Sequence, residues 1–251
     1  MMNQSFHSRS KIVSLTVVLP VYNEEKIIER SLRSLAATLQ EGGIDYEILV
    51  VDDGSTDKTR GILSDLSGDI TGLKILRHSK NQGLGGALQY GFSEASKPLI
   101  FYTDADMPFK YSEILQALLV LESSGSDIIA GFRKNREREG FFRRICSRSY
   151  NLCVRSMYGV QLHDINCAFK LIRSDALRKI DLKAKGSFID AEFVIKASYA
   201  GFRIREFALE YFPRDDNDSR LFRIFPVTNA FIEMVKLYPD IVRVKHSKKK
   251  D

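Results

Sequence analysis

The chain has few of the residues that build zinc sites and disulfide frameworks. Its 251 residues include three cysteines, which form no Cys-x-x-Cys pair, and four histidines, which are scattered along the chain. A zinc site or a disulfide framework is therefore not expected, and reduced thiols in a cytoplasm fit this composition best.

Long apolar runs are also missing. No run of 18 apolar residues occurs, so no segment is expected to span a membrane by itself. Pro20 ends the first apolar run too early for a signal sequence. Hydrophobic residues make up 44 % of the chain and charged residues 28 %, which is ordinary for a soluble globular protein and argues against disorder.

Positive charge is concentrated in one window of the sequence. The net charge is +6, and residues 131–155 alone hold eight Arg or Lys against two Glu, which is also +6. A local excess indicates an anionic partner at one place, and nucleic acid, anionic lipid and a phosphorylated substrate all fit it.

Apolar runs of β type alternate four times with segments of helical period. Strands are expected at 14–19, 47–51, 73–76 and 99–102, and helices at 24–39, at 57–66, from the glycine-rich segment to about 95, and at 112–122. Asn23 is the expected N-cap of the first helix. This alternation predicts an α/β, Rossmann-like fold, in which helices flank a mostly parallel sheet. Ligands bind beyond the carboxyl ends of such strands, so the polar residues that follow each strand should converge.

The second half of the chain adds two amphipathic segments. A basic helix is expected over 143–158, strands at 169–172 and 201–211, and an amphipathic segment at 221–238 that Pro226 interrupts. Each amphipathic segment is either a packed helix with a solvated face or a helix on a membrane surface, and the basic helix could instead present phosphate ligands to the crevice. The predicted organisation is an N-terminal extension (1–14), an α/β domain (15–220), a C-terminal amphipathic helical segment (221–241) and a disordered basic tail (242–251) drawn to anionic head groups.

Two aspartates follow the strand expected at 99–102. Alternate residues of a strand point the same way, so Asp104 and Asp106 should share one side, with the small Ala105 on the other. Two like charges at that separation call for a cation, and Mg²⁺ and Mn²⁺ bind through one or two carboxylates plus substrate phosphates. The alternative is a polar turn after the strand, which Pro108 would mark.

The glycine-rich segment is Asn81–Ala87, read as NQGLGGA. It lacks the Gly-Lys-Ser/Thr of a P-loop and does not fit Gly-x-Gly-x-x-Gly, so binding of NAD or ATP by those motifs is not expected. Its plain interpretation is a tight turn. A phosphatase with an aspartyl nucleophile is also disfavoured, because its Asp-x-Asp pair would follow the first strand.

Four segments together resemble the GT-A fold glycosyltransferases of family 2, in order and in spacing, over residues 15–130. They are Val17–Glu24 (VVLPVYNE), Val50–Asp57 (VVDDGSTD), Asn81–Gly83 (NQG) and Thr103–Asp106 (TDAD). The second half is similar to the polyprenyl-phosphate sugar synthases of the dolichol-phosphate mannose synthase type and their bacterial relatives. That similarity lies in Gly131–Arg133, Phe142–Arg144, Asp164–Lys170, Phe188–Glu192 and Pro213–Arg220.

The resemblance implies an inverting transfer of a sugar from a GDP- or UDP-sugar to a polyprenyl phosphate at the cytoplasmic face of a membrane. The implied ligand-binding residues are Pro20, Tyr22, Glu24, Asp52, Asp53, Gly83, Asp104, Ala105, Asp106, Arg133, Arg148, Asp164 and Arg220. Asp104 and Asp106 would also hold Mg²⁺ or Mn²⁺, and with Arg143 and Arg214 they would form the catalytic set. Arg133, Arg143, Arg148, Arg214 and Arg220 fall at the basic positions that would hold the acceptor phosphate, because the forked donors of arginine bind phosphate oxygens in pairs. For Asp164, sugar contact and an ordinary turn aspartate weigh equally.

One position departs from that branch of the family. Its members usually carry a glutamine two residues after the second aspartate, as a further metal ligand, and Pro108 stands there in this chain. Water or another residue would have to complete the coordination.

Two other functions stay open at this stage. If the acceptor were a saccharide or protein hydroxyl, a general base would be required, and Asp190 and Glu192 are the candidates. A catalytically weak binding or scaffold subunit is the second alternative, because of Pro108. Nucleic acid is not an expected partner, since the acidic cluster would repel its backbone. Whether a membrane-spanning partner subunit is needed is left open.

Overall fold

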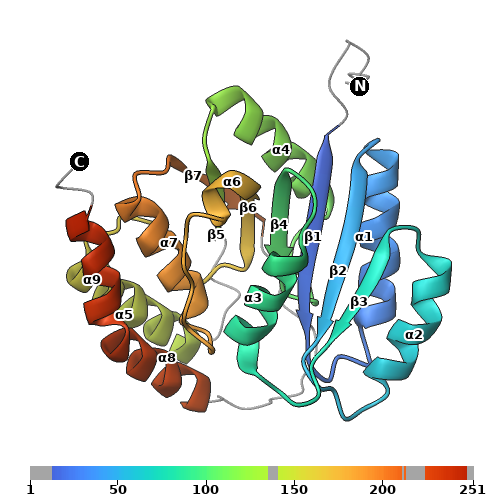
Figure 1. Ribbon diagram of the computed structural model, residues 1–251, viewed down its shortest axis with the longest axis horizontal. Helices are drawn as coiled ribbons and strands as arrows, with labels where there is room; N and C mark the ends of the chain where they lie inside the picture. The colour runs from blue at the N-terminus through green and yellow to red at the C-terminus, as the bar shows by residue number, and fades with distance from the viewer. Residues whose placement is uncertain (1–12, 135–140, 211, 213–223, 248–251) are drawn as a thin grey trace.

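A seven-stranded sheet organises the molecule (Figure 1). The computed structural model describes residues 13–134, 141–210, 212 and 224–247. The strands lie in the order β3-β2-β1-β4-β6-β5-β7. Their bounds are β1 Ser14–Val21, β2 Asp45–Asp52, β3 Leu73–Arg77, β4 Leu99–Thr103, β5 Ile128–Arg133, β6 Phe169–Arg173 and β7 Ile204–Leu209.

The sheet is mostly parallel, as the alternating pattern predicts. β1 pairs in parallel with β2 and β4, and β2 pairs in parallel with β3. β6 is the reversed strand, antiparallel to both β4 and β5, and β7 returns parallel to β5. The carboxyl ends of β1 to β4 therefore share one edge, where the polar segments that follow them meet.

Helices cover both faces of the sheet (Figure 1). They are α1 Ile28–Glu41, α2 Thr59–Asp69, α3 Gly83–Glu94, α4 Ser112–Ser124, α5 Phe141–Tyr158, α6 Ser174–Leu177, α7 Ile189–Tyr199, α8 Ile224–Lys236 and α9 Tyr238–Ser247. Two cores result: α1, α2 and α4 bury their apolar residues on one face, and α3, α5, α7, α8 and α9 on the other. Successive side chains of β1 point to opposite faces of the sheet and so contribute to both cores: Val17 belongs to the first core and Val18 to the second.

Two predicted boundaries are wrong. The first helix begins at Ile28 rather than at residue 24, because Asn23 has a φ of +57° and bonds to a neighbouring loop instead of capping the helix. The predicted basic tail is also shorter than expected, since α9 remains helical to Ser247. Pro226 does not break the segment that contains it. It occupies the first turn of α8, where a missing N–H is tolerated.

The C-terminal helices pack on α5. The rings of Tyr150 in α5 and Phe231 in α8 meet edge to face at 5.6 Å, and the Tyr158 hydroxyl donates to the Met234 carbonyl at 2.7 Å. Ile145 and Leu152 in α5, and Ile232 and Val235 in α8, are exposed. In the described part of the chain no helix combines the length and the apolar character needed to cross a bilayer.

Candidate active site at the carboxyl edge of the sheet

Side-chain hydrogen bonds join the segments that follow β1 and β2. The Asn23 side-chain oxygen accepts from the Thr56 N–H at 2.8 Å, and the Glu24 N–H donates to the Thr59 hydroxyl at 2.8 Å. The Ser55 N–H donates to Asp52 Oδ1 at 2.9 Å. These bonds fix the two loops as one unit at the edge of the sheet, with Tyr22 exposed on it.

Asp53 anchors the glycine-rich segment. Its Oδ1 accepts from the Gln82 N–H at 2.8 Å and lies 2.7 Å from His78 Nδ1, and its Oδ2 accepts from the Gly83 N–H at 2.9 Å. The residue is only 3 % exposed. The sequence predicts that Asp53 holds the nucleotide, and in the structure its carboxylate also fixes the glycine-rich segment through these bonds.

Two backbones approach each other closely at the glycine-rich segment, which we also call the glycine-rich loop (Asn81–Ala87). This approach requires glycine at two of its positions. The Gly85 N–H donates to the Lys185 carbonyl at 2.8 Å. A Cβ would lie 2.5 Å from the Lys185 carbonyl oxygen at Gly83 and 2.2 Å from the Ala184 carbonyl oxygen at Gly85. Gly83 also has a φ of +82°, which side chains rarely adopt. The tight-turn interpretation is thus incomplete, because packing against residues 184–186 also requires glycine there.

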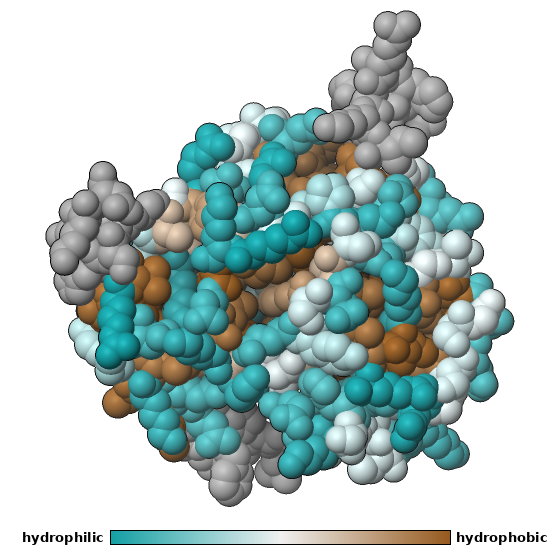
Figure 2. All heavy atoms as spheres, in the orientation of Figure 1, coloured by the Kyte–Doolittle hydropathy of each residue, from teal (hydrophilic) through white to brown (hydrophobic). Residues whose placement is uncertain are grey.

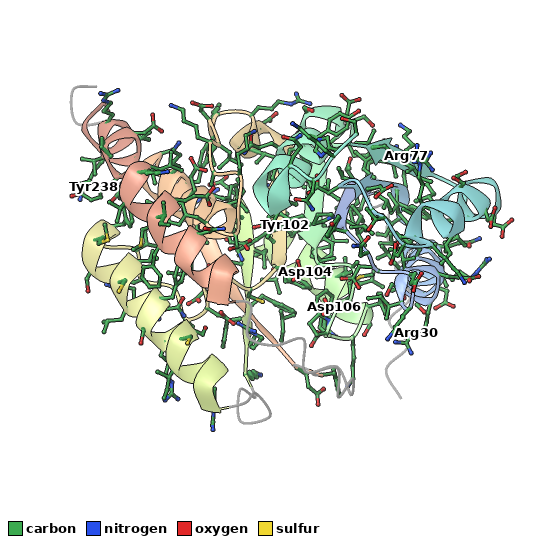
Figure 3. All side chains as sticks on the ribbon, turned by 90° about the horizontal axis from the view of Figure 1, so that it is seen from below. Arg30, Arg77, Tyr102, Asp104, Asp106 and Tyr238 are labelled. Carbon is green, nitrogen blue, oxygen red and sulfur yellow. The ribbon has the colours of Figure 1, made fainter. Side chains whose placement is uncertain are left out.

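Asp104 and Asp106 lie on a turn that follows β4 (Figure 3). The strand ends at Thr103, and the Met107 N–H donates to the Asp104 carbonyl at 3.2 Å, with a φ of +34° at Met107. Strand alternation is therefore the wrong reason for pairing the two carboxylates. The reversal of the chain after Thr103 pairs them instead.

The two carboxylates repel each other. The surrounding protein desolvates the Asp104 carboxyl and the charge of Asp106 adds repulsion, so the pKa of Asp104 rises from 3.8 to about 7. Arg133 acts in the opposite direction and lowers this pKa. Asp104 still has access to solvent, so an ion can reach it.

This pair fits a divalent cation with two protein ligands. A bound cation would remove the repulsion that raises the pKa of Asp104, and carboxylate oxygens are the ligands that Mg²⁺ and Mn²⁺ prefer. Within the described residues no group of three His, Cys, Asp or Glu side chains is placed to hold a metal. Pro108 offers no side-chain ligand, and its carbonyl accepts from the Phe212 N–H at 2.8 Å. Ligands from outside the chain, such as phosphate oxygens or water, would complete the shell.

Arg133 and Asp164 bind each other. Arg133 donates through Nε and a terminal nitrogen to the two Asp164 oxygens, at 2.6 and 3.0 Å, and their side chains are 12 % and 2 % exposed. The resemblance implies ligand binding by Arg133, and for Asp164 it leaves sugar contact and an ordinary turn aspartate equally weighted. In the structure the forked pair sets the position of one cation next to the Asp104 carboxyl.

Of the other predicted arginines, Arg148 is the one whose side chain the structure describes. Arg148 is exposed on the outward face of α5, with Ile145 and Leu152, and not on the face that carries the buried Tyr150. Arg143 is in the first turn of α5, and its side chain lies outside what the structure describes. Arg214 and Arg220 lie outside the described residues altogether.

Asp190 and Glu192, the two candidate bases, have different surroundings. The Tyr102 hydroxyl donates to Asp190 Oδ1 at 2.6 Å, and burial raises the pKa of Asp190 although Lys170 and Tyr102 oppose that shift. Glu192 is fully buried: it accepts from the Lys183 and Ala184 N–H groups at 2.9 and 2.7 Å and pairs with Lys196 at 2.7 Å. Three donors of the protein itself therefore hold the Glu192 carboxylate inside the fold, where it supports residues 183 and 184.

Sequence reasoning missed Tyr102 and Lys170. Both lie within apolar strands, where a polar atom gives no periodic signal. Lys170 is fully buried and donates to the Ile165 and Cys167 carbonyls, so it supports the loop that carries Asp164. The signals available for Lys170 were its place in the similar segment Asp164–Lys170 and the rarity of a lysine in the otherwise apolar run Phe169–Ile172.

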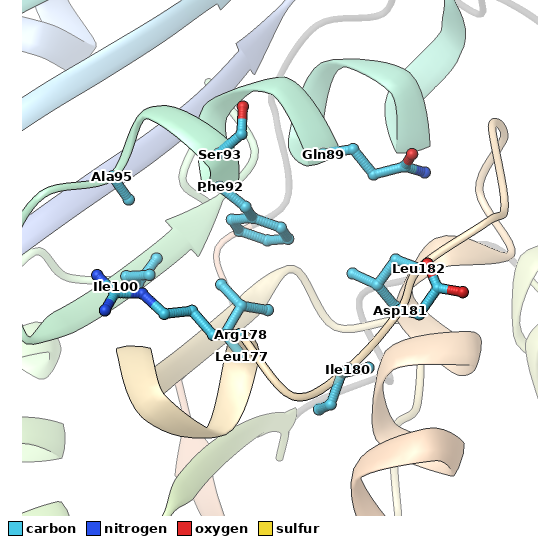
Figure 4. Close-up of a pocket in the computed structure, with 10 residues that line it drawn as sticks. All are labelled: Gln89, Phe92, Ser93, Ala95, Ile100, Leu177, Arg178, Ile180, Asp181 and Leu182. Carbon is cyan, nitrogen blue, oxygen red and sulfur yellow. The ribbon is translucent and has the colours of Figure 1, made fainter. Parts of the chain in front are cut away.

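A separate pocket of about 330 Å³ lies near the start of β4 (Figure 4). Phe92, Ile100 and Leu177 form apolar walls, and Gln89, Arg178 and Asp181 add polar groups. At about 3.3 Å per strand residue, Ile100 lies roughly 13 Å from Asp104, so this pocket is distinct from the carboxylate site.

The model of the glycosyl transferase family 2 domain matches residues 16–181. The chain belongs to glycosyltransferase family 2. Dodecaprenyl-phosphate galacturonate synthase of Rhizobium johnstonii is 30 % identical over 210 residues, covering 83 % of this chain and 62 % of the relative. Glycosyltransferase AglD of Haloferax volcanii is 29 % identical over 221 residues, covering 84 % of this chain and 35 % of the relative. The family 2 chain thus spans 35 to 62 % of the length of these relatives.

Solved structures show the same GT-A fold. Glucosyl-3-phosphoglycerate synthase of Mycobacterium tuberculosis, in complex with Mn²⁺ and UDP-glucose, has a TM-score of 0.67 at 19 % identity, covering 90 % of this chain and 78 % of that one. TarS of S. aureus has a TM-score of 0.56 at 22 % identity, covering 80 and 60 %. The predicted fold and family are confirmed.

Proposed function

We propose that this family 2 glycosyltransferase moves a sugar from a GDP- or UDP-sugar to a polyprenyl phosphate, with inversion at the anomeric carbon. The observation that carries the proposal is the Asp104 and Asp106 pair, whose mutual repulsion calls for a cation and which lies beside the Arg133–Asp164 ion pair. The names of the relatives, a dodecaprenyl-phosphate galacturonate synthase and undecaprenyl-phosphate formamido-arabinose transferases, support the choice of acceptor.

On the donor side, the residues bind and orient a nucleoside diphosphate. Tyr22 is exposed next to the linked loops that follow β1 and β2, and it offers a ring surface for the base. Asp104 and Asp106 would hold Mg²⁺ or Mn²⁺, which when bound neutralises the negative charge of the departing diphosphate. Arg133 adds a fixed positive charge on the same side.

On the acceptor side, a phosphate nucleophile agrees with the surroundings of the candidate bases. A phosphate oxygen is already ionised near neutral pH, so it attacks the anomeric carbon without giving up a proton, and the bond from that carbon to the diphosphate breaks. A hydroxyl acceptor would need a base, and Glu192 is engaged by three donors. Asp190 is 5 % exposed and already accepts from Tyr102.

A membrane surface is the proposed location, at its cytoplasmic face. Besides their exposed apolar residues, α5 and α8 carry exposed cations, a combination that suits a helix pair lying on anionic lipid. Figure 2 shows hydrophobic residues interspersed among hydrophilic ones over the part of the surface where α5, α8 and α9 lie. The exposed cations of these helices are Arg148, Lys236, Arg243 and Lys245. A membrane-spanning partner subunit is the other way to hold the chain there.

The test is a transfer assay with purified protein. Radiolabelled GDP- and UDP-sugars are incubated with polyprenyl phosphate and Mn²⁺, and the product is extracted into organic solvent. We expect label in the organic phase for one donor, and none for the double variant Asp104→Asn/Asp106→Asn. Label that moves only to an added saccharide would favour a hydroxyl acceptor. Nucleotide binding that does not depend on metal would favour a binding subunit instead of an enzyme.

A further inference from the structure

Glu233 in α8 binds a segment that supports the donor side of the site. The N–H groups of Lys185 and Gly186 donate to Glu233 Oε1 at 2.9 and 2.8 Å. A Cβ on Gly186 would lie 2.8 Å from Glu233 Oε2, so a glycine at that position lets the carboxylate approach the backbone. We name residues 183–187 the bridging segment.

The bridging segment contacts the glycine-rich loop on its other side. The Gly85 N–H donates to the Lys185 carbonyl at 2.8 Å. Gln89 makes two further bonds: its Nε2 donates to the Ala184 carbonyl at 2.6 Å, and its Oε1 accepts from Lys185 Nζ at 3.1 Å. Figure 1 shows α3 and α8 on either side of the chain that leads into α7.

The glycine-rich loop is in turn bonded to Asp53, at the carboxyl end of β2. A continuous set of hydrogen bonds therefore runs from α8 through the bridging segment and the glycine-rich loop to the donor edge of the sheet. The segments approach one another closely at the glycines at 83, 85 and 186, where a Cβ would lie 2.2 to 2.8 Å from an oxygen atom of the neighbouring segment.

We propose that Glu233 is a positioning residue, which holds the bridging segment against the glycine-rich loop and so maintains the geometry that binds the donor nucleotide. It lies beyond residues 16–181, the part of the chain that the family model matches. The inference rests on the proposed function only for the identity of the nucleotide.

The test compares Glu233→Ala, Glu233→Gln and a control, Asn229→Ala, which changes an exposed residue one turn earlier in α8. Amide hydrogen exchange is measured at 83–86 and 185–186, and UDP and GDP are titrated in the presence of Mn²⁺. In Glu233→Ala we expect exchange about tenfold faster at both segments and nucleotide binding about fivefold weaker, because local opening becomes easier. Glu233→Gln keeps an acceptor oxygen, so its exchange rates and its nucleotide affinity should be close to those of the wild type. The control Asn229→Ala should match the wild type in both measurements.

Two outcomes would overturn the inference. One is faster exchange at 185–186 in Glu233→Ala with no change at 83–86, and the other is loss of binding that Glu233→Gln does not restore. If Glu233→Ala does not fold, Gly186→Ala displaces the same carboxylate by its methyl group and is measured instead. A wild-type protein that binds neither nucleotide would contradict the proposed function, while the exchange data would still decide the role of Glu233.

Discussion

The carboxylates of Asp104 and Asp106 respond to pH because one of them holds its proton unusually tightly. The pKa of Asp104 is about 7 in the absence of metal, so protons and a divalent cation compete for the same oxygen atoms. We expect the affinity for Mn²⁺, measured by calorimetry with UDP present, to be about tenfold lower at pH 6 than at pH 8. An affinity that stays flat across this range would contradict the raised pKa.

The same group sets a second prediction, for the protein without metal. Because the pKa of Asp104 is higher in the folded than in the unfolded chain, the folded state binds more protons between pH 4 and 7, and stability falls as the pH rises through 7. Asp104→Asn removes the charge, so its melting temperature should exceed that of the wild type at pH 8. The difference should shrink at pH 5. Thermal unfolding of both proteins in EDTA measures this difference. A melting temperature of Asp104→Asn equal to or below that of the wild type at pH 8 would contradict the prediction.

At the residue scale, sequence patterns locate polar groups better than they assign their partners. Position after a strand correctly brings Asp53, Asp104 and Asp106 to one edge of the sheet. It does not reveal that Asp53 bonds to residues 29 and 30 positions later, or that Arg133 binds Asp164. Those partners depend on loop conformations, and loops lack the periodicity that makes strands and helices readable.

At the element scale, the helices that the pattern predicts are those with one buried face. Such a face recurs every three to four residues in α1 and α4, and both were predicted. α7 was not predicted as a helix, because Ile189–Ala197 is buried on all sides and carries Asp190, Glu192 and Lys196 among its buried residues. Burial on every side erases the amphipathic signal.

Two helical glycines allow a matched test of the contact between α3 and the bridging segment. A Cβ at Gly85 would lie 2.2 Å from the Ala184 carbonyl oxygen, whereas a Cβ at Gly61 in α2 meets nothing within 4 Å. We expect Gly85→Ala to lower the free energy of unfolding by about 1–3 kcal/mol or more. Gly61→Ala should raise it by about 0.5–1 kcal/mol, since alanine favours the helix. Urea unfolding of both variants is the measurement, and a neutral Gly85→Ala would mean that the two segments separate easily.

At the scale of the whole molecule, segments far apart in the sequence pack together around the sheet. The first half supplies the donor edge of the sheet, and α8 and α9 from the end of the chain pack on α5 and, through Lys196 and Asp240, on α7. The parallel sheet was predictable because its strands are continuous apolar runs. The position of α8 and α9 was not, since it depends on contacts such as that of Tyr158 with Met234, 76 residues apart.

The apolar residues of α8 that face outward decide whether this surface binds lipid. Ile232 and Val235 are 49 and 62 % exposed, and Leu119 is 47 % exposed on α4, a helix that packs on the opposite face of the sheet. Removing two such side chains from a membrane interface should cost about 1 kcal/mol each, so Ile232→Glu/Val235→Glu should bind anionic vesicles about thirtyfold more weakly. Leu119→Glu should bind like the wild type. Co-sedimentation with phosphatidylglycerol vesicles at low and high salt measures this.

Varying the salt concentration separates the electrostatic contribution to vesicle binding from the apolar contribution. The cations of α5, α8 and α9 act over the Debye length, about 8 Å at physiological ionic strength, so their share should fade as salt rises while the apolar share persists. The wild type should therefore keep part of its binding at high salt, and the double variant should lose what remains. If the purified wild type does not bind vesicles under any of these conditions, a membrane-spanning partner is needed to bring the chain to the proposed lipid acceptor, and α5 and α8 become the first surface on which to look for that contact.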